Sequence, residues 1–197
     1  MLIAIIVIVV VVIVLALIVI GVNNSMIGAR NRVDESWSGI DVQLKRRHDL
    51  VPNLVETVKG YASHERETFQ KVTEARAEAM KAQGPAEAGA AEAKLGSVLG
   101  DLRAISENYP ELRATENFQQ LSRNLSELED EIQAARRIYN SNVQAYNTKI
   151  QVFPNSVIAN NRGFTPREFF EIEDAGDREP VQVSFSQDPP PAASTAS

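Results

Sequence analysis

The sequence predicts an all-α protein: an N-terminal transmembrane helix, an antiparallel up-and-down bundle of four long helices, and a disordered C-terminal tail. Three observations lead to this prediction. Residues 2–20 contain no polar side chain. Residues 26–152 are dominated by Ala, Glu, Gln, Arg and Leu, which are strong helix formers. Apolar residues recur there at spacings of three and four, and strand-like alternation is almost absent.

Residues 1–22 are the predicted transmembrane anchor. At about 1.5 Å per residue, 21 helical residues span roughly 31 Å, close to the hydrocarbon thickness of a bilayer. A soluble core helix has no need to be apolar on every face over this length. A cleaved signal peptide is disfavoured because the apolar run is too long, only Met1 precedes it, and no Ala-x-Ala motif follows it. The predicted partner of residues 1–22 is therefore the lipid bilayer.

Residues 23–32 are the predicted juxtamembrane segment. Its candidate hinge residues are Asn23, Asn24, Ser25 and Gly28. The bases Arg30 and Arg32 flank the C-terminal side of the apolar run, whereas the other side carries only the α-amino group. The positive-inside rule then predicts a single-pass protein whose body lies in the cytoplasm.

The helical bundle is predicted to occupy residues 33–172, and its first helix ends in the basic run 45–48. One face of that helix is apolar: Val33, Trp37, Ile40, Leu44 and Val51. Pro52 follows, and a proline is far better tolerated in a first turn than in a helix interior. We favour a turn at 49–54 with Asp49 as N-cap, because the basic run then complements the helix dipole. One long helix kinked at Pro52 is the alternative.

The second and third helices are bounded by proline and glycine. The second is predicted from about Leu54 to Gln83, where Gly84-Pro85 stops it. Residues 86–93 are Ala-rich and are either a loop or a helix start, and alanine favours the helix. The third helix then ends before Pro110, since the residue before a proline avoids the helical conformation.

The fourth helix is the longest and most regular. Thr115 is its candidate N-cap and Pro154 ends it. Its apolar residues form a heptad seam, typical of a coiled coil: Phe118, Leu121, Leu125, Leu128, Ile132, Ala135, Tyr139, Val143, Tyr146, Ile150 and Phe153. Three asparagines crowd this seam beside its tyrosines, and they either fix the register of the bundle or specify a homo-oligomer: Asn140, Asn142 and Asn147.

Residues 155–161 are predicted as one short helix closed by Gly163. Four antiparallel helices reverse direction three times, so the fourth returns toward the membrane. Two interpretations of the aromatic residues that follow therefore stand: they meet lipid with flanking bases, or they plug the open end of the bundle. These residues are Phe164, Phe169 and Phe170, with Arg162 and Arg167. Residues 173–197 are acidic and then Pro/Ala/Ser-rich, which predicts disorder, although Val181–Phe185 alternate like a strand.

Composition excludes several function classes. The chain has no cysteine, which excludes disulfides, cysteine–zinc sites and thiol catalysis. Its net charge of −6 argues against nucleic acid as a partner. The two histidines, His48 and His64, complete no Glu-x-x-His pattern of the kind a di-iron bundle uses. No nucleophile elbow, zinc-protease motif or phosphate-binding loop occurs.

Three remaining clusters are more readily explained as structure. The acids at 127 and 129–131 are interpreted as a solvated helix face, and the basic run 45–48 as compensation of a helix dipole. Trp37 and Phe118 are interpreted as core residues. The sequence thus predicts no catalytic, cofactor-binding or metal-ligating residue, no cofactor, and no enzyme.

Three long stretches resemble the bacterial LemA family. They are RNRVDESWSGIDVQLKRRHDLVPNLVETVKGYASHE at 30–65, ENFQQLSRNLSELEDEIQAARRIYNSNVQAYNTKIQVFPNSVIA at 116–159, and GFTPREFFE at 163–171. The resemblance implies an N-terminal anchor in the bacterial cytoplasmic (inner) membrane, followed by an antiparallel helical bundle. Genes of this family often accompany membrane metalloproteases, which implies work in the cell envelope. The expected function is a non-enzymatic membrane-anchored scaffold or assembly module. The alternative is an accessory or regulatory partner of a membrane metalloprotease in envelope quality control.

Overall fold

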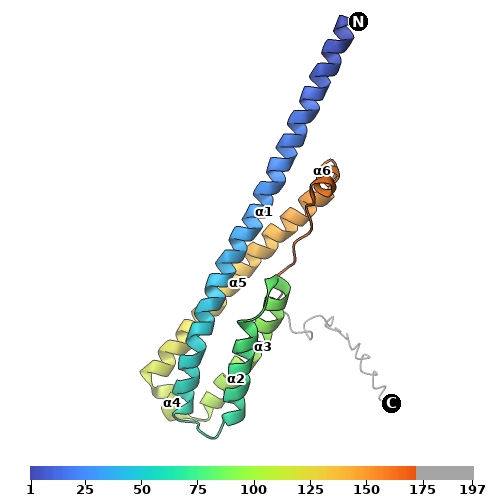
Figure 1. Ribbon diagram of the computed structural model, residues 1–197. Helices are drawn as coiled ribbons and strands as arrows, with labels where there is room; N and C mark the ends of the chain where they lie inside the picture. Colours follow the sequence, from blue (N-terminus) through green and yellow to red (C-terminus); the bar gives the residue numbers. More distant parts are fainter. Residues whose placement is uncertain (172–197) are drawn as a thin grey trace, which may run out of the picture.

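The computed structural model describes residues 1–171, in which the regular elements are all helices and there is no strand, as the sequence predicts. The helices are α1 (Leu2–Lys59), α2 (Arg66–Ala79), α3 (Gly84–Glu107), α4 (Pro110–Ala114), α5 (Glu116–Gln151) and α6 (Asn155–Arg162). Figure 1 shows a long rod, from which the first part of α1 projects alone. The predicted tail at 173–197, with Val181–Phe185, lies outside the described residues.

The helix α1 is one unbroken element of 58 residues. Its apolar N-terminal part is exposed on every face, and α1 is the one helix among residues 1–171 long and apolar enough to cross a membrane. The predicted hinge at 23–28 is wrong, because these residues are helical and Met26 and Ala29 are already buried in the core. One continuous helix thus contains both the candidate membrane span and the first core residues.

The predicted turn at 49–54 is also wrong, and the alternative of one long helix holds. Pro52 has no N–H to donate to the carbonyl of His48, four residues earlier. Arg76 of α2 supplies the missing donor, since its Nε lies 2.7 Å from that carbonyl oxygen. A buried or half-buried carbonyl needs such a partner, so α2 allows α1 to continue through the proline. The sequence gives no direct sign of this long-range bond.

The chain instead reverses at residues 60–65, just after Gly60. Gly60 is the C-cap of α1, and glycine is a weak helix former. At Pro52, by contrast, the bond from Arg76 satisfies the carbonyl of His48, so the helix continues. The expected second helix, Leu54–Gln83, is therefore divided between the end of α1 and the 14-residue α2. Gly84 and Pro85 begin α3, and the Ala-rich 86–93 stretch is helical. A bundle of four long helices is not confirmed.

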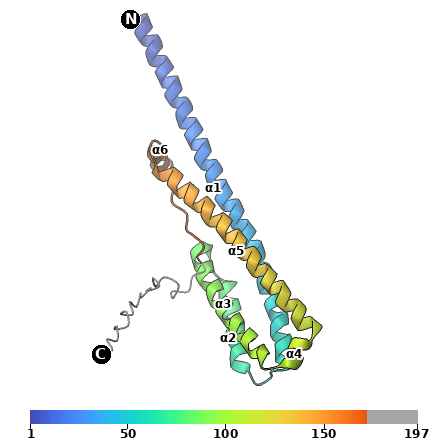
Figure 2. The ribbon, with the colours of Figure 1, turned by 180° about the vertical axis from the view of Figure 1, so that it is seen from behind.

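The helices α1 and α5 run side by side in opposite directions along the rod (Figures 1 and 2). Near the end of α5, Lys149 Nζ donates a hydrogen bond to Ser25 Oγ at 3.0 Å, near the start of the body. Arg46 and Glu131 pair farther along, at 3.8 Å. The shorter α2–α3 hairpin packs beside the distal part of this pair. The C-terminal end of α5 therefore returns to the end of the body from which the apolar part of α1 projects, which we call the anchor side after the candidate membrane span.

Several local predictions at helix ends are confirmed. Thr115 caps α5, with its hydroxyl accepting a bond from the amide of Phe118. The helix α3 ends at Glu107, before Pro110. The short helix after Pro154 is α6, closed by Gly163 at φ 72°, a left-handed conformation that glycine adopts without strain. These signals are local, so sequence alone identifies them.

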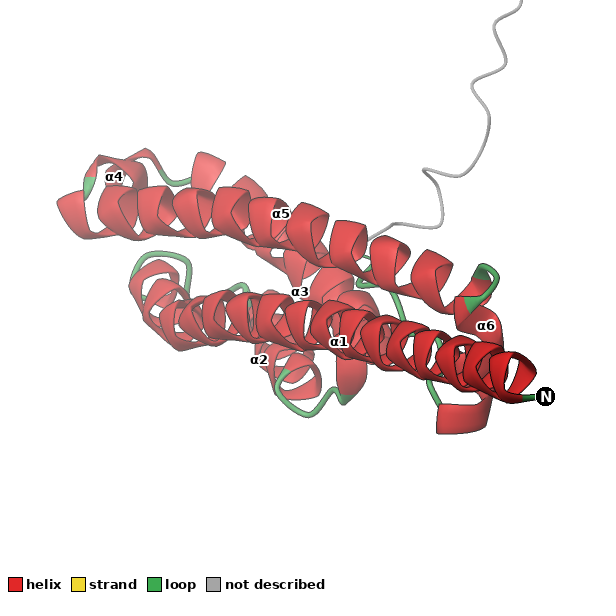
Figure 3. Cartoon of the chain, turned by 90° about the horizontal axis from the view of Figure 1, so that it is seen from above, coloured by secondary structure: helices red, strands yellow, loops and turns green. Residues whose placement is uncertain are grey.

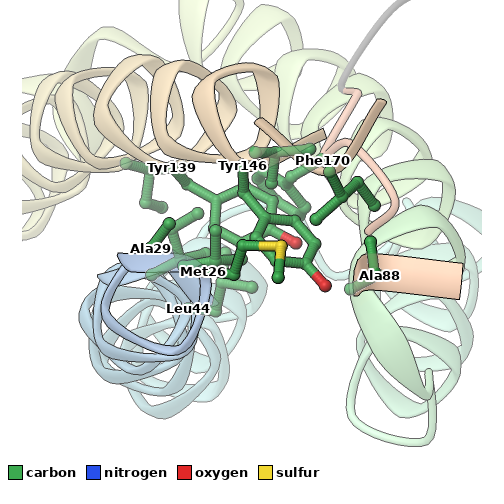
Figure 4. Close-up of a cluster of buried hydrophobic side chains, with 13 residues drawn as sticks. Met26, Ala29, Leu44, Ala88, Tyr139, Tyr146 and Phe170 are labelled. Carbon is green, nitrogen blue, oxygen red and sulfur yellow. The ribbon is translucent and has the colours of Figure 1, made fainter. Parts of the chain in front are cut away.

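Two apolar clusters fill most of the body. The anchor-side cluster joins α1, the start of α3, α5, α6 and the segment after α6, and Figure 4 shows it in close-up. Its buried members are Met26, Ala29, Val33, Ile40, Leu44, Ala88, Ile132, Tyr139, Val143, Tyr146, Ile150, Ala159 and Phe170. The distal cluster joins the far ends of α1 and α5 to α2, α3 and α4, and consists of Val51, Leu54, Val58, Ala62, Phe69, Val72, Leu102, Leu112 and Phe118.

Most of the predicted seam of α5 is buried within this chain, facing α1. Trp37 and Phe118 belong to the core as predicted, and the Trp37 ring lies 5.5 Å from that of Tyr139. Phe153 is the exception, because α5 ends at Gln151 and the ring is 83% exposed.

Candidate functional site

The segment 163–171 is the most specifically held non-helical part of the body, and we call it the clasped segment. It leaves α6 in extended conformation and runs back along α5 toward the start of α3 (Figures 1 and 3). An extended chain beside a helix must find partners for its own N–H and C=O groups. Here the partners are side chains of α5.

Two asparagines of α5 each hold the backbone of one residue of the clasped segment at both polar groups. Asn140 donates from Nδ2 to the carbonyl of Phe170 (3.1 Å) and accepts from its amide at Oδ1 (3.0 Å). Asn147 does the same with Arg167, at 2.9 and 2.8 Å. Each carboxamide thus makes the pair of hydrogen bonds that the backbone of a neighbouring strand would make in a sheet.

Two tyrosines add a second row of bonds. The hydroxyl of Tyr139 donates to the carbonyl of Glu168 at 2.8 Å, and that of Tyr146 to the carbonyl of Thr165 at 3.0 Å. A Tyr-Asn pair therefore occurs twice on α5, at 139–140 and at 146–147, seven residues apart. The residues of the clasped segment that the two pairs bind are three residues apart. Seven helical residues advance about 10.5 Å and three extended residues about 10 Å, so the two spacings match.

The tyrosine hydroxyls lie in a largely dry environment. Burial raises the pKa of Tyr139 to about 12, opposed by the nearby Arg167 and assisted by Glu168. Burial likewise raises the pKa of Tyr146. Both phenols are therefore neutral at physiological pH and available as hydrogen-bond donors.

The clasped segment closes the core, which supports the interpretation that its aromatic residues plug the open end of the body. Phe170 is completely buried and its ring lies 5.7 Å from Trp37, while Phe164 and Phe169 are partly buried against the same cluster. The end of the segment also packs closely on α3, since a Cβ added to Gly89 would clash with the backbone of Glu171. The rings plug the body, and the prediction that they meet lipid is wrong for Phe170.

Basic residues next to these aromatic rings also find partners within the chain. The Arg30 guanidinium lies 5.6 Å from the centre of the Phe164 ring, a cation–π distance. Arg167 pairs with Asp34 at 3.0 Å. Asn142 contributes a weaker bond, 3.4 Å from Nδ2 to the carbonyl of Arg32. The asparagines thus fix an intramolecular register, one of the two roles that the sequence left open.

A second candidate site is a buried ion cluster between α1, α3 and α5. Glu92 of α3 is only 1% exposed, and its two oxygens receive different partners. His48 Nε2 lies 2.5 Å from one, and Arg47 Nη1 lies 3.3 Å from the other. Arg47 also pairs with Glu129 of α5 at 3.3 Å. These four groups tie three helices together, and each buried charge has a partner, as burial requires.

This cluster corrects two interpretations of the sequence. The run at 45–48 does not compensate a helix end, because α1 continues to Lys59. The acids of α5 are not only a solvated face, since Glu129 and Glu131 pair with Arg47 and Arg46. The sequence did not indicate that Arg47 and His48 share a partner, because Glu92 lies in an Ala-rich stretch 44 residues beyond His48.

A cavity of about 370 Å³ opens beside the cluster, between α3 and α5. Its lining includes polar Arg47, Glu92 and Glu129 and apolar Leu99, Phe118 and Leu125. Among residues 1–171, no group of three or more acidic or histidine side chains is arranged to hold a metal ion, and His64 is exposed.

The fold and these sites define an all-helical protein in which one apolar helix continues into a tightly tied body. The chain belongs to the LemA family: the family model matches residues 36–185, which is more than half of the chain.

Curated relatives match at low identity. A magnetosome protein, MamQ 2 of Paramagnetospirillum magneticum, is 26% identical over 180 residues, covering 78% of this chain and 66% of that protein. Protein LemA of Metamycoplasma hominis is 29% identical over 146 residues, covering 72% and 65%. Magnetosome protein MamQ of Magnetospirillum gryphiswaldense is 28% identical over 166 residues, covering 71% and 61%. The chain thus spans under two thirds of the length of these relatives.

Proposed function

We propose that this protein is a non-enzymatic, membrane-anchored scaffold or assembly module of the bacterial cell envelope. The observation that carries the proposal is the continuity of α1. The same helix presents an apolar surface of bilayer length on all faces and then supplies buried core residues from Met26 onward. Because such a helix has no break, it fixes the position of the body relative to the membrane.

The interior of the body supports a structural role. Its buried polar side chains Arg47 and His48 both contact Glu92, and its buried tyrosines donate hydrogen bonds to backbone carbonyls. Catalytic groups are instead usually directed at a substrate position. The magnetosome relatives are named for a cellular structure, which fits assembly better than turnover.

Location and partners belong to the same proposal. We place residues 1–22 in the cytoplasmic membrane and the body in the cytoplasm, since Arg30 and Arg32 follow the apolar run. Further copies of this chain are the partner that a scaffold implies. The names of the relatives give no support to a role beside a membrane metalloprotease.

The test has two steps on the full chain. Membranes carrying the protein are washed with high salt and with alkaline carbonate, and we expect the protein to remain in the pellet. The detergent-solubilised protein is then weighed by native mass spectrometry, and we expect a homo-oligomer. Release by carbonate would contradict the anchor, and a particle containing one copy of the chain with a stoichiometric protease would contradict the scaffold.

A further inference from the structure

The corner between α5 and α6 carries an apolar surface that the body does not cover. Phe153 is 83% exposed, Val157 62% and Val152 46%. We call these three residues the corner patch. Isolated exposed apolar residues are ordinary, but three at one turn form a surface that favours a partner.

The contacts of α1 place the corner patch at the level where α1 leaves its apolar stretch. Lys149 is bonded to Ser25, and three further helical residues advance about 4.5 Å toward the anchor side. Val152 is therefore about level with Val22. Val22 and Ile158 of α6 pack against the same cluster, and Figures 1 and 2 show α6 beside α1. If residues 1–22 fill the bilayer, the patch lies at its surface.

The charged residues nearest this end are mostly basic. Residues 1–33 and 132–167 contain no Asp or Glu, although the chain has 26 acidic residues and a net charge of −6. The bases in these ranges that lie toward the corner are Arg30, Arg32, Lys149 and Arg162. Arg167 is paired with Asp34, and Arg136 and Arg137 lie about four turns farther along α5. Exposed apolar side chains with basic neighbours are the composition that binds the interface of a membrane with anionic lipids.

We infer that the corner patch is a second membrane-contact site, which inserts Phe153 and Val157 at the headgroup boundary of an anionic lipid surface beside the anchor. This rests on the proposed membrane anchoring of residues 1–22. Two points of contact on neighbouring helices fix the tilt of the rod, which a single helix would leave free to vary. The clasped segment is bonded to α5 and thereby holds α6, so the corner is rigid enough to keep this position.

The test uses the full chain in vesicles of phosphatidylcholine with phosphatidylglycerol. Spin labels are placed on single cysteines that replace Val157, Ile138 or Val12, since the chain has no native cysteine. Ile138 is the matched control, because it is a 60% exposed apolar residue of α5 away from the corner. Accessibility to oxygen relative to a nickel chelate reports depth. We expect the ratio at 157 to exceed that at 138 several-fold, and the ratio at 12 to be the highest.

Two further variants test the residues and the charge. In the Val157 label background, Phe153→Ser should reduce the ratio toward that of position 138. Arg162→Gln should reduce it in vesicles with phosphatidylglycerol and leave it unchanged in pure phosphatidylcholine.

Each outcome distinguishes the two proposals. Equal ratios at 157 and 138, with a high ratio at 12, would overturn the corner site and leave the anchor intact. A low ratio at 12 would overturn the anchor itself. Dipolar broadening between labels at 157 on neighbouring chains would show that a second copy covers the patch instead of lipid. A ratio at 157 independent of phosphatidylglycerol would overturn the anionic component.

Discussion

The two ends of the body are held by different chemistry. At the anchor side, the side chains of α5 bind the backbone of the clasped segment, and aromatic rings fill the space beneath it. At the distal side, aliphatic residues from several helices pack together, and beside them the cluster around Glu92 borders an open cavity. Hydrogen bonds to fixed backbone atoms define one geometry, whereas aliphatic packing tolerates rearrangement. We therefore expect the anchor side to hold a single geometry more firmly than the distal side.

The largest expected effect comes from a charge placed where α1 and α5 pack. Ile132 is completely buried, so Ile132→Asp should unfold the body at a cost of several kcal/mol against a total stability of about 5–15 kcal/mol. Ile138→Asp, on the exposed face of the same helix, is the control and should change little. Thermal unfolding of the full chain in detergent, followed by circular dichroism, measures both. Equal melting temperatures for the two variants would show that the seam does not face α1.

The next effect concerns the distal side. Glu92→Ala leaves buried Arg47 and His48 without their common partner, and breaking such a cluster costs about 3 kcal/mol. The control is Glu131→Ala, which removes an exposed pair with Arg46 and should cost at most about 1 kcal/mol. Denaturant unfolding compares them. If both losses are the same, the cluster is not a determinant of the distal side.

A smaller and more local effect is expected at the clasped segment. Asn140→Ala removes two hydrogen bonds, each contributing about 1 kcal/mol, and should expose the amide of Phe170. Hydrogen exchange at Phe170 should accelerate, while amides of the distal cluster keep their protection. Asn142→Ala removes one longer bond to a different element and should leave Phe170 unchanged. Uniform acceleration throughout the body would contradict a locally held segment.

The smallest effect is a dependence of stability on alkaline pH. The pKa of Tyr139 is about 12 in the folded protein, against 10.0 for the free side chain, because burial disfavours the phenolate. The folded state therefore holds this proton more tightly. Its contribution is fully present below pH about 10 and is lost as pH rises toward about 12. Tyr139→Phe should flatten this part of the stability profile, and an unchanged slope would contradict the assignment.

The sequence predicted what depends on local signals. Helical class, the apolar N-terminal stretch, the Thr115 cap and the close of α6 at Gly163 follow from composition, periodicity and residues within one turn. The apolar seam of α5 could also be predicted, because seven-residue spacing places its residues on one face of the helix. Even so, the seam was extended to Phe153, which lies past the end of the helix.

What could not be predicted depends on partners far along the chain. Pro52 remains inside α1 because Arg76 bonds the carbonyl that proline leaves free. Arg47 and His48 turn inward because Glu92 of α3 meets them. The sequence analysis noted the asparagines and tyrosines of α5 as residues in or beside the seam. It did not recognise that a seven-residue repeat on a helix matches a three-residue repeat on an extended segment. That match is the one signal in the sequence that could have located the candidate site.

The central claim is that α1 passes unbroken from the anchor into the body. Its most direct test is the distance between spin labels on cysteines replacing Val14 and Asp41, which are 27 residues apart and both exposed. For the full chain in a lipid bilayer, an unbroken helix predicts a narrow distribution centred near about 40 Å. A broad distribution at shorter distances would mean that the helix bends at residues 23–28, and would contradict the account.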